Sequence, residues 1–182
     1  VVRAAGGDLG AAGLALAELS GLAGRGARRE IAASGGTALL IDESYNANPA
    51  SMRATLAQLG TTPARRRIAV LGAMKELGTH GPAFHAALAR PIADAGVDFA
   101  LLVGPEMAAL ADALETDELG KSVRASLGKR FAFAHCADVR EAGELLRGFG
   151  LERGDVILVK GSNSVGLGAL VAALAAGKDA SP

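Results

Sequence analysis

One stretch decides the fold, and it runs Leu39-Leu40-Ile41-Asp42-Glu43-Ser44-Tyr45-Asn46-Ala47-Asn48-Pro49-Ala50-Ser51-Met52. Its three leading aliphatic residues predict a short buried strand over 38–41, and a polar loop follows where that strand ends. Pro49 fixes φ and ends the strand, and Ser51 is expected to cap a helix from about Met52 to Leu59. In open α/β sheets such corners, at the carboxyl ends of the strands, are where ligands bind.

The polar loop of this stretch is a candidate binding site because five of its side chains are acidic, phenolic or amide groups: Asp42, Glu43, Tyr45, Asn46 and Asn48. The alternative is an Asx-rich turn that serves only the backbone, which is the usual interpretation of a lone Asn-Pro. A hydrophobic core needs none of these groups, so their crowding at one corner favours a site.

Strands and helices alternate along the rest of the chain. Further strands are expected over 28–31, 68–71, 99–103, 130–134 and 156–159, and further helices over 82–95, 106–114, 139–146 (capped by Asp138) and 167–175. A turn at 34–37 would pair the first strand with the 38–41 strand as a hairpin. This order predicts an α/β fold, with a mostly parallel sheet covered by helices on both faces. The strands that end at Ile41, Leu71, Val103 and Val159 would then be neighbours, and the loops after them would share a cleft.

Composition limits the functions that the chain can have. It has 182 residues, with 19 Lys and Arg against 19 Asp and Glu, so its formal net charge is zero. This balance argues against binding to nucleic acid or to an anionic membrane, and 65–67 (Arg-Arg-Arg) is expected to be the solvated start of a strand. The single Cys136 excludes an intrachain disulfide and a cysteine-based zinc site.

Without a spanning apolar run or a signal peptide, a cytoplasmic protein is expected. The first residue is Val1 and the chain opens close to a helical pattern over 9–19, which suggests a piece of a longer protein.

Three more segments attract attention. The loop 160–166 (Lys-Gly-Ser-Asn-Ser-Val-Gly) can form an anion cradle at a helix N-terminus or a purely structural turn, but it lacks the Gly-Lys-Ser/Thr ending of an ATP phosphate loop. Glu76, in the loop 72–78, is either functional or simply solvated. The glycine-rich linker 21–26 presents Arg25, which is again either functional or solvated. The spacing of the three histidines argues against a metal site.

Together these segments resemble the Mur ligase family of bacterial peptidoglycan synthesis, and within it the ligases that add D-alanyl-D-alanine. The matching runs are Gly24-Arg25-Gly26, Ile41 to Pro49 with Ser51-Met52, Val70 to Gly78 with His85, and Leu158 to Ser162. The run Ser44 to Pro49 is specific among Mur ligases, and the other runs support it. The resemblance covers essentially the whole chain.

The resemblance implies a Rossmann-like C-terminal domain over 27–182, preceded in 1–26 by a helical remnant of the family's central ATPase domain and a hinge. It also implies a monomeric, ATP- and Mg²⁺-dependent ligase that joins D-alanyl-D-alanine to UDP-N-acetylmuramoyl-tripeptide through an acyl phosphate. Nucleotide contacts would come from Arg25, Asp42, Glu43, Tyr45, Asn46 and Asn48. Substrate contacts would come from Glu76, Lys160, Gly161, Ser162 and Asn163. No catalytic residue and no metal ligand is assigned.

Three positions depart from the family pattern. Glu43 stands where the family usually has Asp, Ala73 where Asp is common, and Asn163 where Arg is frequent. The family's Gly-Lys-Thr phosphate loop and its magnesium ligands belong to the missing central domain, which would hold most of the ATP and Mg²⁺ site. The chain alone is therefore expected not to ligate. Two alternatives remain: a Mur ligase with another amino-acid substrate, or a stand-alone Rossmann-like binding or regulatory module.

Overall fold

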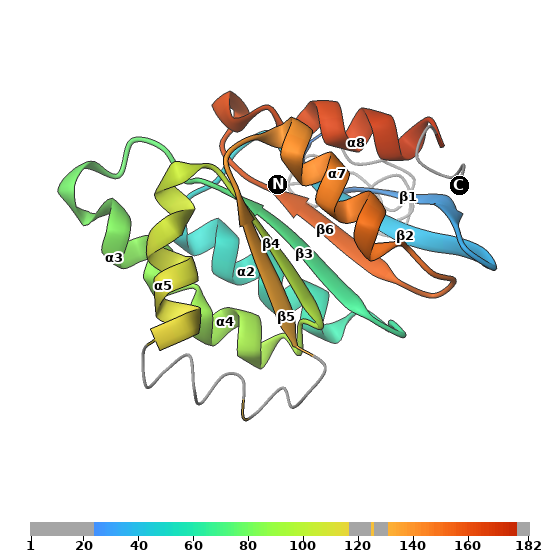
Figure 1. Ribbon diagram of the computed structural model, residues 1–182, viewed down its shortest axis with the longest axis horizontal. Helices are drawn as coiled ribbons and strands as arrows, with labels where there is room; N and C mark the ends of the chain where they lie inside the picture. Colours follow the sequence, from blue (N-terminus) through green and yellow to red (C-terminus); the bar gives the residue numbers. More distant parts are fainter. Residues whose placement is uncertain (1–23, 117–124, 126–130, 178–182) are drawn as a thin grey trace, which may run out of the picture.

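The computed structural model describes residues 24–116, 125 and 131–177. The expected helix over 9–19, the first part of the 21–26 linker and nearly all of 117–130 lie outside the described residues. Within the described part, six strands form one sheet (Figure 1): β1 (Ala27–Ala33), β2 (Gly36–Glu43), β3 (Arg67–Gly72), β4 (Phe99–Val103), β5 (Ala132–Cys136) and β6 (Val156–Lys160). Their order across the sheet is β1-β2-β6-β3-β4-β5.

The sheet is mixed at one edge and parallel elsewhere. β1 and β2 are antiparallel, with Ala27 opposite Asp42 and Ala33 opposite Gly36, which confirms the expected hairpin. β2 and β6, β6 and β3, β3 and β4, and β4 and β5 all pair in parallel. β4 and β6 are buried along their whole length, which explains their unbroken apolar sequences, because a parallel strand covered on both faces has no solvent side.

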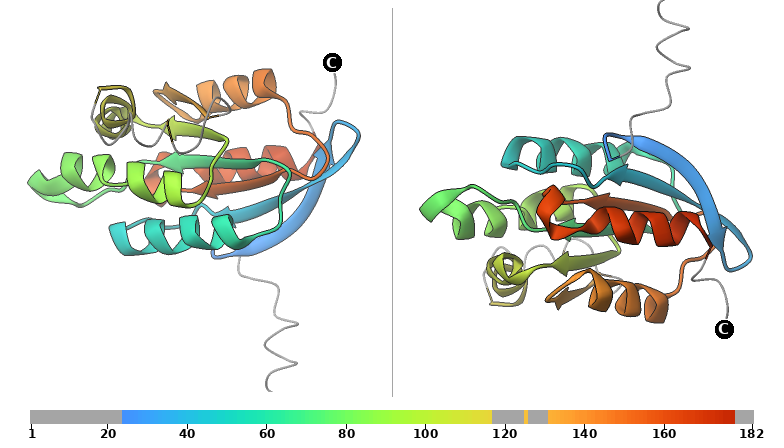
Figure 2. Two further views of the ribbon diagram at one scale, coloured as in Figure 1. Left: turned by 90° about the horizontal axis from the view of Figure 1, so that it is seen from below. Right: turned by 90° about the horizontal axis from the view of Figure 1, so that it is seen from above.

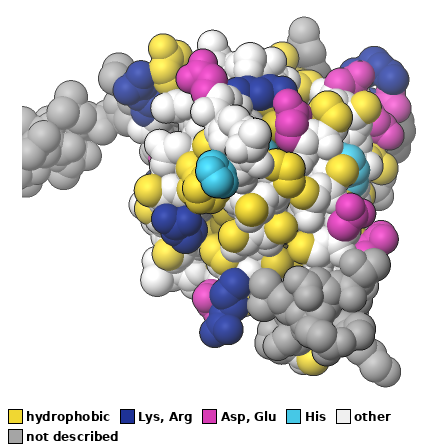
Figure 3. Space-filling model, turned by 90° about the vertical axis from the view of Figure 1, so that its left-hand side faces the viewer, with side chains coloured by type: hydrophobic (Ala, Val, Ile, Leu, Met, Phe, Trp, Pro, Cys, Tyr) yellow, Lys and Arg dark blue, Asp and Glu magenta, His cyan; other side chains and the backbone are white. Residues whose placement is uncertain are grey.

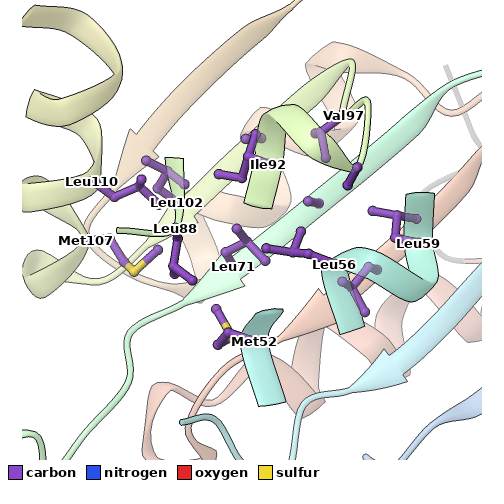
Figure 4. Close-up of a cluster of buried hydrophobic side chains, with 14 of the residues drawn as sticks. Met52, Leu56, Leu59, Leu71, Leu88, Ile92, Val97, Leu102, Met107 and Leu110 are labelled. Atoms are coloured by element: carbon purple, nitrogen blue, oxygen red, sulfur yellow. The ribbon is translucent and has the colours of Figure 1, made fainter. Parts of the chain in front are cut away.

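The helices cover both faces of the sheet, as the sequence predicts. They are α2 (Pro49–Thr61), α3 (Gly81–Ala86), α4 (Ala89–Asp94), α5 (Ala108–Thr116), α7 (Val139–Phe149) and α8 (Leu167–Ala175). Side chains of α2, α4 and α5 form one core with Leu71 and Leu102 of the sheet (Figure 4). α7 and α8 pack on the opposite face against side chains such as Val70 and Val159. The two views of Figure 2 show α2 and α7 on opposite sides of the sheet.

The expected helix over 82–95 is wrong in one respect, because the structure divides it into α3 and α4 at Ala87 and Leu88. Pro91 explains the break. It has no N–H to donate to the carbonyl of Ala87, and its ring would collide with that carbonyl in a continuous helix. Apolar residues still recur across the break, so Leu88, Ala89 and Ile92 are fully buried.

Smaller differences concern the ends of elements. The N-cap of α2 is Asn48 and not Ser51, and the helix runs to Thr61. β5 begins two residues later than expected. Asp138 caps α7 as predicted, because its Oδ1 accepts a hydrogen bond from the N–H of Glu141 at 2.9 Å. No helix among the described residues has the length and apolarity needed to span a membrane.

The expectation that 65–67 is simply solvated is wrong for Arg66. Its Nε and Nη2 bind both carboxylate oxygens of Asp155, at 2.9 and 2.6 Å, and its guanidinium lies 4.7 Å from the centre of the Phe149 ring. The hydrogen bond to Asp155 raises the pKa of Arg66 above its ordinary value. Arg66 therefore fastens β3 to the turn before β6.

Candidate functional site

Three loops meet at the carboxyl edge of the sheet, because the strands that lead into them are neighbours. They are residues 44–48 after β2, 73–77 after β3 and 161–166 after β6, and together they are called the three-loop edge below. β2 and β3 lead to helices on one face, whereas β6, between them, leads to α8 on the other. This is a topological switch point, where open α/β sheets bind ligands.

Asp42 lies at this edge, but its carboxylate bonds to neighbouring groups of the protein. Its Oδ2 accepts a hydrogen bond from the N–H of Gly24 at 2.8 Å, and its Oδ1 accepts from the N–H and the hydroxyl of Ser44, at 3.1 and 2.6 Å. The residue is 3 % exposed. Its carboxylate thus holds the turn after β2 and the end of the linker together, while its predicted contact with a nucleotide stays a prediction.

Arg25 and Tyr45 form the exposed part of the site. The guanidinium carbon of Arg25 lies 4.3 Å from the centre of the Tyr45 ring, a cation–π arrangement, and Tyr45 is 48 % exposed. Gly24 makes this approach possible: its φ is +75°, and a Cβ there would lie 2.7 Å from the Cβ of Tyr45. The glycines of the linker therefore do more than give it flexibility, since Gly24 allows the linker backbone to pack against Tyr45 in the loop after β2.

The two asparagines of the loop serve the backbone turn that was the alternative interpretation of this stretch. Asn46 is exposed, and its Oδ1 accepts a hydrogen bond from the N–H of Ala47 at 2.8 Å. Asn48 accepts from the N–H of Ser51 at 2.8 Å, and the Ser51 hydroxyl accepts from the N–H of Asn48 at 3.1 Å. This capping box starts α2. An Asx turn and a ligand site are compatible here, because the turn leaves Asn46 at the surface.

Lys160 lies toward the loop after β2 and not over the loop that follows it. Its side chain is buried, with Nζ 2.8 Å from the carbonyl oxygen of Asn46 and 3.5 Å from Oε2 of Glu43. Burial lowers the pKa of Lys160 below its ordinary value, and the Glu43 carboxylate opposes that shift. The structure thus groups this predicted substrate residue with predicted nucleotide residues.

Ser162 connects the loop after β6 to the loop after β3. Its N–H donates to the carbonyl of Ala73 at 3.1 Å, and its hydroxyl accepts from the N–H of Lys75 at 2.9 Å. Gly161 allows the two loops to approach this closely: a Cβ on Gly161 would lie 2.9 Å from the Cα of Gly72 and 2.8 Å from Leu167 Cδ1. Asn163, next along, is exposed. Lys160 and Ser162 therefore tie the central loop to both of its neighbours.

Glu76 borders a hollow of about 240 Å³ beside the three-loop edge, lined by 74–78, Gly81, Pro82, His85 and Glu106. Glu76 has φ +63°, which is uncommon for a residue with a side chain and turns the loop sharply. Lys75 and Glu106 form an ion pair at the same hollow, and the Lys75 hydrogen bond lowers the pKa of Glu106. Figure 3 looks onto the side of the molecule that carries α3 and α5, where charged side chains surround hydrophobic ones.

Sequence reasoning missed the roles of Glu106 and His85. His85 is 1 % exposed, and both of its ring nitrogens bond to the backbone. It is therefore a buried structural residue that supports the loop after β3. The signals were not local: His85 meets a backbone amide eleven positions earlier, and Glu106 meets Lys75 thirty-one positions away. Among the residues that the structure describes, no three His, Cys, Asp or Glu side chains gather in a way that could hold a metal ion.

The sequence and the fold match a known class of proteins. A family model described as Mur ligase, glutamate ligase domain, matches residues 27–163. The chain therefore belongs to the Mur ligase family. It is 39 % identical over 145 residues to the UDP-N-acetylmuramoyl-tripeptide–D-alanyl-D-alanine ligase of Synechocystis sp., covering 76 % of this chain and 28 % of that protein. It is 37 % identical over 158 residues to the ligase of the same name from Mycobacterium tuberculosis, covering 82 % and 31 %.

Solved structures agree with this assignment. MurF from Acinetobacter baumannii superposes with a TM-score of 0.71 at 27 % identity, over 96 % of this chain and 35 % of that one. MurF ligase from Thermotoga maritima, solved in complex with ADP, has the same fold, with a TM-score of 0.67 at 23 % identity over 97 % and 35 %. The chain thus spans about a third or less of the length of these relatives.

Proposed function

We propose that the chain is the C-terminal domain of a ligase that joins D-alanyl-D-alanine to UDP-N-acetylmuramoyl-tripeptide. Residues 27–182 would form this domain, and 1–26 would be the end of a preceding ATPase domain with its hinge. The observation that carries the proposal is the three-loop edge, where a loop tied to both neighbours stands at the switch point of the sheet in a member of the Mur ligase family. Such an edge can hold two reactants side by side, and positioning is a large part of ligation chemistry.

The described residues fit part of a nucleotide site. Arg25 and Tyr45 offer a cation and an aromatic face at the surface, and Asn46 offers an exposed amide. Glu43 is partly exposed beside Lys160. When bound, ATP would supply the phosphoryl group that activates the tripeptide carboxylate. The groups that cradle its phosphates and Mg²⁺ would belong to the preceding domain, which closes on this one by the hinge.

The loops after β3 and β6 would face the dipeptide. Glu76 and Asn163 are exposed there, and the backbone of 161–163 lies beside the loop 73–77 through Ser162. A small zwitterion such as D-alanyl-D-alanine needs hydrogen-bond donors for its carboxylate and acceptors for its ammonium group. Lys75 would offer a donor, and the acids Glu76 and Glu106 would offer acceptors, within one region.

The test compares the protein encoded by the whole reading frame that contains this chain with the 182-residue chain alone. Release of inorganic phosphate from ATP is measured with UDP-N-acetylmuramoyl-tripeptide and D-alanyl-D-alanine, and L-alanyl-L-alanine serves as the matched control. We expect phosphate release by the longer protein only, and only with the D,D-dipeptide. Release with single amino acids but not with the dipeptide would indicate a sister ligase. No release by the longer protein under any of these conditions would favour a binding or regulatory module.

A further inference from the structure

His85 occupies a position that its chemistry makes unusual. It lies on α3, is 1 % exposed, and its Nδ1 is 2.7 Å from the carbonyl oxygen of Gly81. Its Nε2 accepts a hydrogen bond from the N–H of Met74 at 2.9 Å. Nδ1 must therefore carry the proton and Nε2 must carry none, so both bonds exist only when the ring is neutral.

The backbone that His85 holds is the backbone that binds Ser162. The carbonyl of Ala73 accepts the N–H of Ser162, and the N–H of Lys75 donates to its hydroxyl. The Met74 amide lies between these two contacts in the chain, and its partner is the His85 ring. Three consecutive residues thus carry one continuous set of bonds from α3 to the loop after β6.

We propose that His85 is a positioning residue of the three-loop edge: its neutral ring fixes residues 73–75 in the conformation in which they hold Ser162. Protonation of Nε2 removes the acceptor for the Met74 N–H and puts a second donor in its place. The amide then has no partner, and the loop shifts away from Ser162. The consequence for ligation rests on the proposed function, in which the Ser162 loop faces the dipeptide.

The electrostatic surroundings favour the neutral ring near pH 7. Burial lowers the pKa of His85 below its ordinary 6.5, and the charge of Lys75 lowers it further, while Glu106 and the bond to Gly81 oppose the shift. The other charged or titratable groups on the segments around α3 are Glu76, His80, Asp112 and Glu115. An unfolded chain binds this proton more readily than the folded one, so the contribution of His85 to stability is complete above pH 6.5 and is lost as the pH falls below it.

The test follows amide hydrogen exchange and ring ¹⁵N shifts by NMR in the 182-residue chain between pH 7.5 and 5. These pH values are roughly one unit above and 1.5 units below the ordinary pKa of histidine. In the unaltered chain we expect His85 to be the Nδ1–H tautomer at the upper end. Protection of the Lys75 amide should fall about tenfold as the ring becomes charged, the effect of losing one hydrogen bond. The amide of Leu39, which donates to Asp155 at the other end of the strands, is the internal control and should keep its protection.

Two substitutions separate positioning from packing. His85→Gln keeps an acceptor that can reach the Met74 N–H and has no charge to gain. His85→Asn places its amide near Nδ1 and reaches no further. We expect His85→Gln to retain Lys75 protection at every pH, and His85→Asn to lose it at every pH while Leu39 stays protected.

The proposal is overturned if protection of the Lys75 amide does not change as His85 becomes charged in the unaltered chain. It is also overturned if His85→Gln and His85→Asn show the same Lys75 protection. The first measurement needs no substitution, so a variant that fails to fold cannot leave the question open. None of these readouts uses a substrate. The two proposals can therefore fail separately. If these NMR results are as expected but the longer protein releases no phosphate with the dipeptide, the positioning role of His85 stands and the proposed function is wrong.

Discussion

The ammonium group of Lys160 donates a hydrogen bond to the backbone carbonyl of Asn46 across 2.8 Å, inside the protein, and so joins the end of β6 to the loop after β2, more than a hundred residues earlier in the sequence. Glu43 stands 3.5 Å from the same nitrogen. A buried cation with one carbonyl and one carboxylate partner stabilises the fold only if these bonds exceed the cost of removing it from water.

Replacing Lys160 with Met tests that balance, because it keeps most of the volume and removes the charge. We expect the free energy of unfolding to fall by about 1–3 kcal/mol, since the Asn46 carbonyl loses its partner and Glu43 loses its counter-charge. Urea denaturation measures the change. Lys75→Met is the matched control: its lysine is 39 % exposed and paired with Glu106 at the surface, so its loss should cost about 0–1 kcal/mol. A Lys160→Met variant as stable as the parent would mean that desolvation cancels the two bonds.

Asp42→Asn tests the turn that joins the linker to β2. One carboxylate oxygen becomes an NH₂ group, which must then face the N–H of Gly24 or the groups of Ser44. We expect a loss of about 1–3 kcal/mol in the free energy of unfolding without any ligand present. Asp94→Asn removes an exposed carboxylate paired with Arg90 one helical turn away, and it should cost less than about 0.5 kcal/mol. Equal effects of the two substitutions would argue against a structural role for Asp42.

Two glycine-to-alanine substitutions should act in opposite directions. Gly161→Ala places a methyl group 2.8 Å from Leu167 Cδ1 and 2.9 Å from Gly72 Cα, so we expect a loss of about 1–3 kcal/mol from overpacking. Gly148→Ala, within α7, adds a methyl group that meets no atom within 4 Å apart from its chain neighbours and its own helix backbone, so we expect a gain of about 0.5–1 kcal/mol from helix propensity. Thermal melts of both variants give the signs directly, and stabilisation by Gly161→Ala would contradict the close approach of the two loops.

Arg66 and Arg65 are neighbours with different surroundings, which makes them a matched pair. Arg66→Ala leaves the fully buried side chain of Asp155 without its bidentate partner, and we expect a loss of about 3 kcal/mol or more. The side chain of Arg65 is 68 % exposed and pairs with Glu152 at 3.4 Å, so Arg65→Ala should cost about 0–1 kcal/mol. The denaturation midpoint of Arg66→Ala should also depend little on salt.

Cys136 provides a pH-dependent test. Burial, together with Glu141 and Asp138, raises the pKa of its thiol from 9.0 to about 11. The unfolded chain therefore loses this proton first, and the contribution of the thiol to stability declines as the pH rises from about 9 toward 11. The difference in unfolding free energy between the parent and Cys136→Ala should narrow over that range. Iodoacetamide at pH 8 should leave the folded chain unmodified and should label it once in denaturant, and rapid labelling of the folded chain would contradict the burial of Cys136.

Local pattern was enough to predict much of the fold. β4 and α8 begin and end where their apolar runs predict, and Asp138 caps α7, because these features depend on residues a few positions apart. The break at Ala87 and Leu88 was predictable from the same kind of information, since the missing N–H and the ring clash that cause it are properties of one residue, Pro91. Apolar periodicity continues across the break and conceals it.

The candidate site was predictable as a set of loops but not as a set of contacts. The position of each polar residue after a strand is a local property, and the alternation of strands and helices brings those strand ends together. The direction in which a side chain points is not local. Lys160 donates to the carbonyl of Asn46, Asp42 accepts from the N–H of Gly24, and His85 accepts from the N–H of Met74. Each of these hydrogen bonds depends on a partner that only the folded chain brings within reach.

The order of the strands has a consequence for how the chain folds during synthesis. β6 lies between β2 and β3, yet it comes last in sequence among the six strands of the described sheet. Until residues 156–160 leave the ribosome, the β1–β2 hairpin has no parallel partner, and β3 carries an open edge. The completion of the sheet is thus delayed until β3, β4 and β5 have all been made, and during that interval the unpaired edges of β2 and β3 are the surfaces that a chaperone would have to protect.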